Sequence, residues 1–183
     1  HMSNQASQIA PQLPYLRRYA RALTGDQIGG DRFVRQCLET LIEDPTPLDS
    51  ASSPRVGLFK AFHELWSATQ DHRAAAPTPP LESGGAMAAE DRVLSLSPIH
   101  REALLLVAME GFAVNEAAEV LELDQDAMAR TVKEARAALT GQLATRILII
   151  EDEPIIALDL EAIVSAMGHQ VVGVARTAEE ARE

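Results

Sequence analysis

The chain has 183 residues, a formal net charge of −11, and a composition that is 46% apolar but only 4% aromatic. Such an acidic chain is expected to avoid nucleic acids and anionic membranes and to suit a basic protein partner, although the acidity alone would equally serve solubility. Cys37 is the single cysteine, which excludes an intrachain disulfide and a cysteine-based zinc site. We find no signal peptide and no apolar span of about 18 residues, so we expect a cytoplasmic protein.

Residues 14–24 are predicted to form a helix. Leu16, Tyr19 and Leu23 recur at helical spacing on one side, and Gly25 ends the pattern. The opposite side carries three arginines, which are Arg17, Arg18 and Arg21. We interpret these arginines as a solvated basic face rather than as a binding site.

Two further helices are predicted before residue 72. The second helix begins at Asp31, which is placed to cap it, and its apolar side includes Cys37. A loop with two prolines, residues 45–53, leads to the third helix, in which we assign Trp66 to the core and His63 to a structural or exposed position. Three helices with complementary apolar stripes can bury a shared core.

This three-helix unit, residues 8–71, resembles the −10-recognising region of extracytoplasmic-function sigma factors. The resemblance rests on the segment LPYLRRYARALTGD and on the acidic start of the next helix. Promoter melting requires exposed aromatic and basic residues that stack on and hold a flipped base. The loop at residues 43–53 has neither kind, and Gly57 stands where a tryptophan is common in that family.

Residues 72–90 are rich in Pro, Ala and Gly and are predicted to be a linker. Residues 91–141 then have the layout of a helix-turn-helix unit. Gly111 is expected to end its first helix, Asn115 to cap the second, and Asp124 to cap the third. In most proteins with this layout the third helix enters the DNA major groove.

The charge of this unit is wrong for DNA binding, because duplex affinity depends on Lys and Arg that neutralise phosphates. The turn and second helix carry four acidic residues and no basic one: Glu116, Glu119, Glu122 and Asp124. The unit resembles the −35-reading region of the same sigma factors, whose last helix typically carries a basic row. Here Ala129, Thr131, Glu134 and Ala137 stand at several of those positions, and Glu122 stands where the turn usually has Gly. We therefore interpret the unit as a DNA-binding fold that does not bind DNA.

The remaining residues, 146–183, have a different pattern. The apolar run ILII is typical of a doubly buried parallel strand, and it ends in Glu151, Asp152 and Glu153. A helix from Pro154, a second strand at residues 171–175 and a capping-box signal at Thr177 follow. The segment RILIIEDEPIIALDLEAIV resembles the opening of a response-regulator receiver domain, of which it covers about the first third.

Carboxylates at the C-terminal end of a parallel strand lie where open α/β sheets bind ligands, and hard oxygen donors suit Mg²⁺. By the receiver resemblance, Glu151 and Asp152 belong to the acidic pocket that holds Mg²⁺ in the intact domain. The phosphoryl-accepting Asp and the later Thr/Ser and Lys of receivers have no counterpart in the sequence. We therefore expect an incomplete metal site, no phosphoacceptor, and no cofactor in this chain.

The order of the parts resembles the PhyR type of response regulator. We thus predict a mainly α fold: two sigma-factor-like helical units joined by a linker, followed by the opening β-α-β of a truncated α/β receiver. The resemblance implies an anti-anti-sigma factor, which sequesters a NepR-type anti-sigma factor by partner switching when a histidine kinase signals phosphorylation. The alternative is a sigma factor or other DNA-binding regulator. No nucleophile with a base and no phosphate-binding loop is visible, so an enzyme is not expected.

Five residues are assigned to partner binding: Tyr15, Tyr19, Phe112, Val114 and Ala129. We expect one anti-sigma chain to bind between the two sigma-like units through apolar surface. The receiver segment is expected to leave an apolar strand edge exposed, which invites strand exchange between protomers.

Overall fold

The computed structural model describes residues 2–73, 89–143 and 146–182, and it divides into two compact units, His1–Ala135 and Arg136–Glu183. Residues 8–71 of the first predicted helical unit and residues 91–135 of the second therefore lie together in one compact unit, and residues 136–141 belong to the other. Most of the predicted linker, residues 74–88, lies outside the described residues. None of the described helices is long and apolar enough to cross a membrane.

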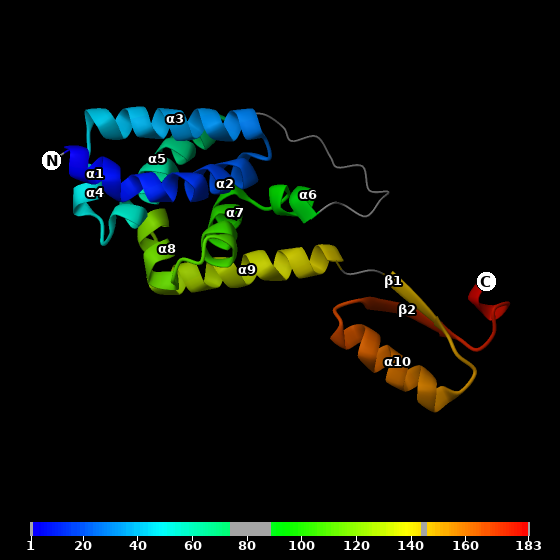
Figure 1. Ribbon diagram of the computed structural model, residues 1–183. Coiled ribbons are helices and arrows are strands. Elements are labelled where there is room, and N and C mark those ends of the chain that lie inside the picture. The colour runs from blue at the N-terminus through cyan, green and yellow to red at the C-terminus, as the bar shows by residue number, and fades with distance from the viewer. Residues whose placement is uncertain (1, 74–88, 144–145, 183) are drawn as a thin grey trace. The chain divides into compact units, whose positions relative to one another are not determined.

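The described residues of the first unit form helices joined by short turns, with no strand among them (Figure 1). Its N-terminal half consists of α1 (Met2–Ile9), the 3₁₀ turn η1 (Ala10–Gln12), α2 (Leu13–Thr24), α3 (Gln27–Glu43), α4 (Thr46–Ser50) and α5 (Pro54–Arg73). Its C-terminal half consists of α6 (Ala89–Leu94), α7 (Pro98–Leu104), the π-helical turn η2 (Leu105–Met109), α8 (Val114–Leu121) and the first part of α9 (Gln125–Leu143), a helix that continues into the second unit.

One aromatic core joins the two halves. Tyr19 of α2 packs against Phe59 of α5 with ring centroids 5.3 Å apart. Phe59 in turn meets Phe112, which precedes α8, edge to face at 4.9 Å. Phe33 and Trp66 extend the cluster between α3 and α5, so the predicted core position of Trp66 is confirmed. A continuous core across both halves makes them a single packing unit.

The start of α3 differs from the one expected from the sequence. The helix begins at Gln27, not after Asp31, and Asp26 is its N-cap, accepting hydrogen bonds from the amides of Ile28 and Gly29 at 3.2 and 2.7 Å. The neighbouring Gly29 and Gly30 suggest a loop, but both lie inside α3. Gly30 has no side chain to keep α2 away from this helix. A Cβ there would lie 2.8 Å from the backbone nitrogen of Arg21, so α2 and α3 touch backbone to backbone.

The segment expected to be a loop, residues 45–53, contains the short helix α4. Asp44 initiates it by accepting a hydrogen bond from the amide of Thr46 at 3.0 Å, and hydrogen bonds from Thr46 hold the pKa of Asp44 below its ordinary value. The helix lies on α5 at Gly57, where a Cβ would sit 2.6 Å from the carbonyl oxygen of Pro47. Gly57 is therefore explained by close packing, because a larger side chain would displace α4.

The second unit contains the predicted β-α-β arrangement. Strand β1 (Arg146–Ile150) pairs in parallel with β2 (Gln170–Ala175), and α10 (Pro154–Ala166) connects them. Ile149, Ala157 and Ala175 are buried between helix and sheet. Four apolar residues of the strands are exposed instead: Leu148, Ile150, Val172 and Val174. Strand exchange through this surface stays a prediction.

Replacing Gly57 with alanine is expected to lower the free energy of unfolding by about 1–3 kcal/mol, because the added methyl group collides with the backbone of α4. Gly141→Ala in α9 is the matched control, since nothing lies within 4 Å of the position that its Cβ would take. That change should leave stability equal or raise it by up to about 1 kcal/mol. Urea titration followed by circular dichroism measures both. Equal stability of Gly57→Ala and wild type would contradict the packing of α4 on α5.

Cys37 is expected to be chemically inert in the folded protein. Its thiol is 1% exposed in the core, and burial raises its pKa to about 12, with Glu64 adding to the shift. A raised pKa keeps the thiol protonated at pH 8, whereas an unfolded chain has its thiol pKa near the ordinary value of about 8.5. Labelling with Ellman's reagent at pH 8 should be slow until urea unfolds the helical unit. Immediate labelling of the native protein would place Cys37 outside the core.

Candidate functional site

The helix-turn-helix predicted from the sequence is formed by α8 and α9. Gly111 adopts a left-handed φ of 70° before α8, and Asp124 caps α9 by accepting a hydrogen bond from the amide of Ala127 at 2.7 Å. The expected cap at Asn115 is wrong, because Ala113 is the N-cap of α8. The amide of Ala113 donates to the carboxylate of Glu116 at 3.0 Å. The side chain of Glu116 therefore satisfies a backbone amide at the start of its own helix.

Glu122 ends α8 in the left-handed region, with φ 55° and ψ 38°. It is the only residue other than glycine with positive φ among the described residues. This conformation costs a side-chain-bearing residue on the order of 1–2 kcal/mol. The turn therefore keeps the geometry that favours glycine, while the residue present supplies a carboxylate.

The four acidic residues of this region all have partners inside the chain. Glu116 and Asp124 close the starts of α8 and α9, as described above. Glu119 accepts a hydrogen bond from the amide of Ser52 at 2.8 Å, and hydrogen bonds from Ser52 lower the pKa of Glu119. Glu122 forms an ion pair with Lys60 of α5 at 3.3 Å. Two of the acids that oppose DNA binding thus also connect α8 to the N-terminal half.

A buried carboxylate forms the strongest polar link between the halves. The side chain of Glu110 is fully buried and receives two hydrogen bonds from Arg18 of α2, at 3.0 and 2.9 Å. Arg18 also donates to the carbonyl oxygen of Met109 at 3.3 Å. The π-helical turn η2 places Glu110 there, since its amide bonds to the carbonyl of Leu105 five residues back. Two parallel hydrogen bonds between an arginine and a carboxylate fix the relative orientation of the two side chains and also stabilise the contact.

Arg55, at the start of α5, lies against the same end of η2. Its guanidinium carbon is 3.9 Å from the centroid of the Phe112 ring, and one of its Nη atoms donates to the carbonyl oxygen of Glu110. A cation over an aromatic face contributes about 1–2 kcal/mol when it is partly desolvated. Two arginines from different helices of the N-terminal half therefore hold the residues that lead into α8.

A second buried pair lies deeper between α5 and α7. The Nδ1 atom of His63 is 2.8 Å from Glu102, and both side chains are almost completely buried. The neighbouring Tyr19 phenol has a pKa raised well above its ordinary value, by burial and then by the Glu102 carboxylate. Of the two positions left open for His63, structural or exposed, the structure shows the structural one.

The α2 arginines are partly exposed, as a solvated face requires, but each of them also pairs with a carboxylate of the same chain. Arg17 and Arg21 both bond to Asp31 of α3, with closest distances of 3.1 and 2.8 Å, and these bonds hold the pKa of Asp31 far below its usual range. Arg18 belongs to the Glu110 pair. The sequence hides these contacts because Asp31, in front of an apolar stripe, has the pattern of a helix cap.

The exposed side of α9, which would face DNA in a sigma factor, has mixed charge. Arg130, Lys133 and Arg136 are exposed along α9, together with Asp126, Ala129 and Glu134. Glu134 accepts from Nε2 of His100 at 2.9 Å. A surface with so few unopposed cations offers little of the phosphate neutralisation on which duplex binding depends.

The five residues predicted to bind a partner fall into two groups. Tyr15, Val114 and Ala129 are exposed, at 47% for Tyr15 and 38% for Val114. Tyr19 and Phe112 are 1% and 3% exposed and belong to the aromatic core, so in this structure they cannot touch a partner directly. The helical period places Tyr15 and Tyr19 on one helix but cannot tell which of them is buried, and Phe112 lies in the turn before α8, where no helical period applies.

Glu151 and Asp152 lie after the C-terminal end of β1, as predicted. The amide of Glu151 bonds to the carbonyl oxygen of Ala175, and its carboxylate accepts from the amide of Glu153 at 3.0 Å. Within the described residues, no group of three or more His, Cys, Asp or Glu side chains could hold a metal ion. The assignment of Glu151 and Asp152 to an incomplete Mg²⁺ pocket therefore stays a prediction, since two adjacent carboxylates supply only part of the oxygen ligands that Mg²⁺ takes.

The fold defines a class of protein: a sigma-factor-like helical unit followed by a receiver-like β-α-β unit. Two family models match the chain, the Sigma2 domain of PhyR over residues 9–63 and the sigma-like domain of the response regulator PhyR over residues 94–142. Together these matches cover more than half of the sequence. The chain belongs to the PhyR family.

Similar proteins from two bacteria support the assignment to the PhyR family. The phyllosphere-induced regulator PhyR of Methylorubrum extorquens is 42% identical over 176 residues, which are 96% of this chain and 64% of that protein. The chain thus spans somewhat less than two thirds of that relative. The structure of the anti-anti-sigma factor PhyR complexed with the anti-sigma factor NepR from Bartonella quintana is 40% identical with a TM-score of 0.75, over 97% of this chain and 66% of that one.

A third similar structure is the PhyRSL–NepR complex from Sphingomonas sp. Fr1. It is 38% identical with a TM-score of 0.58, over 73% of this chain and 85% of that one.

Breaking the Glu110 pair is expected to loosen the helical unit. Arg18→Met should lower the free energy of unfolding by about 1–3 kcal/mol, because it leaves a buried carboxylate without its charged donor. Arg17→Met, which removes one of two arginines from the more exposed Asp31, should cost less than about 1 kcal/mol. Chemical denaturation of the variants, with Glu110→Gln and the double variant, gives the coupling energy. Additive effects of Arg18→Met and Glu110→Gln would show that the two side chains do not interact.

Proposed function

We propose that this chain is a regulator rather than an enzyme: an anti-anti-sigma factor that binds and sequesters a NepR-type anti-sigma factor in the cytoplasm. The sigma-like fold supplies the surface that an anti-sigma factor recognises. Sequestration then frees the true sigma factor, which is the partner switching implied by the family. In the intact protein, phosphorylation of the receiver controls this exchange.

One observation carries the proposal. The chain keeps a sigma-like helix-turn-helix, but the acidic residues that stand in its turn and second helix serve internal contacts, with Ser52 and Lys60 of the N-terminal half among their partners. A sigma fold held together in this way has given up duplex binding while keeping its shape. The relatives described as PhyR bound to NepR support the same assignment.

The exposed members of the predicted partner set, Tyr15, Val114 and Ala129, are the side chains we assign to this partner. The guanidinium carbon of Arg18 lies 5.4 Å from the centroid of the Tyr15 ring. Tyr15 is therefore next to the pair that Arg18 forms with Glu110. Tyr15 is held in place by Arg18, which is itself bound to the buried Glu110, and a preformed side chain lowers the entropic cost of association.

The chain is expected to bind the NepR-type protein from the same organism with 1:1 stoichiometry and submicromolar affinity. Isothermal titration calorimetry measures both quantities, and co-elution on gel filtration is the independent check. Val114→Glu should weaken binding by introducing a charge that the partner has to desolvate, whereas Ile28→Glu, at a more exposed isoleucine of α3, is the control for surface charge.

A gel shift with promoter duplex at about 0.15 M salt separates this function from the alternative of a working sigma factor or DNA-binding regulator. We expect no sequence-specific retention. Retention competed only by −35-type sites, together with no heat against the anti-sigma factor, would reverse the assignment.

A further inference from the structure

The outward side of α3 presents the two most exposed large apolar residues that the structure describes in the first unit. Ile28 is 73% exposed and Ile42 is 65% exposed. The interval between them is about four helical turns, so both side chains lie on the same side of α3. The opposite side of the helix packs into the core through Val34, Cys37 and Leu41, at the edge of the unit (Figure 1).

The charged residues of this outward side change sign along the helix. Arg32 and Arg35 come first, and Glu39 and Glu43 follow; all four are exposed. None of the four forms an ion pair with another described residue. Asp31, by contrast, is already bound by two arginines of α2. The outward side of α3 is therefore basic toward its start, acidic toward its end, and unpaired within the described part of the chain.

A stripe with this order of charges is complementary to a second copy of itself that runs in the opposite direction. When Arg32 lies opposite Glu39 of the second copy, a two-fold axis repeats the pair, because the same patch serves on both sides. Arg35 then lies opposite the neutral Gln36 of the second copy. A partner of uniform charge would be repelled by one end of the stripe, so the order of charges favours a second copy as the occupant.

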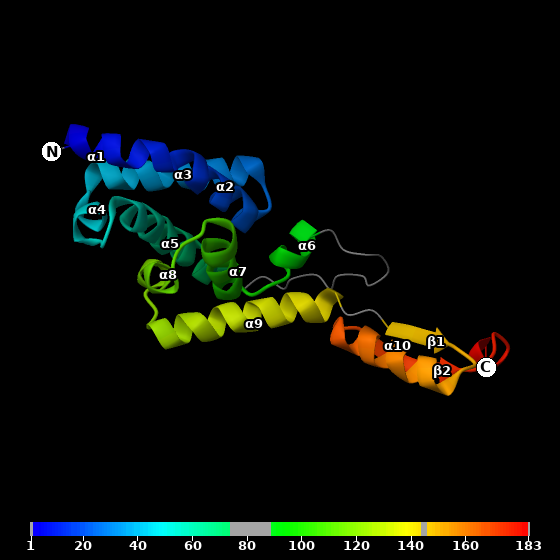
Figure 2. The same ribbon diagram turned by 60° about the horizontal axis from the view of Figure 1, so that its bottom comes forward.

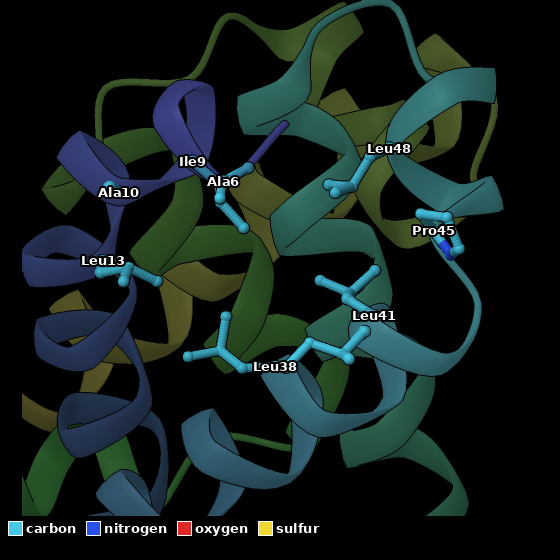
Figure 3. Close-up of a pocket in the computed structure, with 9 residues that line it drawn as sticks. Ala6, Ile9, Ala10, Leu13, Leu38, Leu41, Pro45 and Leu48 are labelled. Carbon is cyan, nitrogen blue, oxygen red and sulfur yellow. The ribbon is translucent and has the colours of Figure 1, made fainter. Parts of the chain in front are cut away.

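The antiparallel arrangement also provides an occupant for an apolar pocket of about 330 Å³ at the C-terminal end of α3 (Figure 3). Figure 3 shows Leu38 and Leu41 of α3 at this pocket, with Leu13 on the opposite wall. Ile42 lines the pocket as well. In the antiparallel pair, Ile28 of the second copy reaches this end of the helix beside Ile42. An exposed isoleucine and an apolar pocket are thereby removed from water together, once on each side of the two-fold axis.

We propose that two copies of this chain associate through antiparallel α3 helices, with an Arg32–Glu39 pair on each side of the two-fold axis and Ile28 of each copy at the pocket of the other. One helix from each copy makes a contact at the small end of protein interfaces, so we expect a reversible dimer with a Kd on the order of 10–100 µM. The stripe contains neither Tyr15 nor Val114, so it is separate from the residues assigned to the anti-sigma factor.

Complementary charge reversals test the pairing. Arg32→Glu brings two carboxylates together in each pair, and Glu39→Arg brings two arginines together, so either variant alone should self-associate roughly tenfold or more weakly than wild type. A mixture of the two variants restores opposite charges in both pairs and should form a mixed dimer about as strong as that of wild type. Arg130→Glu, at an exposed arginine of α9, is the control and should leave self-association unchanged.

A substitution at Ile28 tests the apolar contact. Ile28→Glu should weaken self-association roughly tenfold, because a carboxylate would have to be desolvated at the pocket. Ile28→Leu keeps an apolar side chain of the same size and should retain the dimer. Sedimentation velocity over a concentration series, with one variant fluorescently labelled in the mixture, measures all of these species. Circular dichroism verifies that each variant is folded, as expected for changes at exposed positions.

The outcomes decide between occupants of this face. Rescue in the mixture is the expected result, since a parallel pair would bring Arg32 against Arg32 and could not produce it. A wild-type chain that stays monomeric well above the expected Kd overturns the inference, and so does loss in each variant without rescue in the mixture. Self-association that the α3 variants leave unchanged would place the contact elsewhere, such as the strands of the second unit. Variants that weaken anti-sigma binding but not self-association would assign the face to that partner, which also overturns the inference.

Discussion

The pair between the buried carboxylate of Glu110 and the half-exposed Arg18 is the constraint on which the rest of the helical unit depends. A carboxylate with no exposed surface is costly unless it is paired, so α2 has to lie where its arginine reaches the end of η2. Once α2 and η2 are joined, Phe112 meets Phe59 and lies under Arg55. The position of α8, and with it the start of α9, follows from these contacts (Figure 2).

The acidic residues of the helix-turn-helix thereby do two things at once. Glu119 and Glu122 attach α8 to Ser52 and Lys60, and the same carboxylates make the surface unfavourable for phosphates. A sigma factor needs its corresponding surface free and basic. In this chain the same side chains that hold α8 on the N-terminal half are also the ones that make this surface acidic.

Much of the fold could be predicted from the sequence because helical periods and glycine ends are local signals. The stripes of α2 and α5, the turns at Gly25 and Gly111 and the β-α-β order all follow from such patterns. The contacts of Asp31, Glu110 and His63 could not be predicted, since each pairs with a residue distant in sequence or on another helix. Likewise, periodicity places Tyr19 and Tyr15 on one helix but only packing shows which is buried.

The central claim is that a sigma-like fold serves here as a protein-binding surface in competition with a sigma factor. The most direct measurement uses a fluorescently labelled sigma factor bound to its NepR-type anti-sigma factor, with fluorescence anisotropy recorded as this chain is added. We predict that anisotropy falls to the value of free sigma factor as one equivalent of the chain is added. Unchanged anisotropy at a large excess of folded chain would contradict the account.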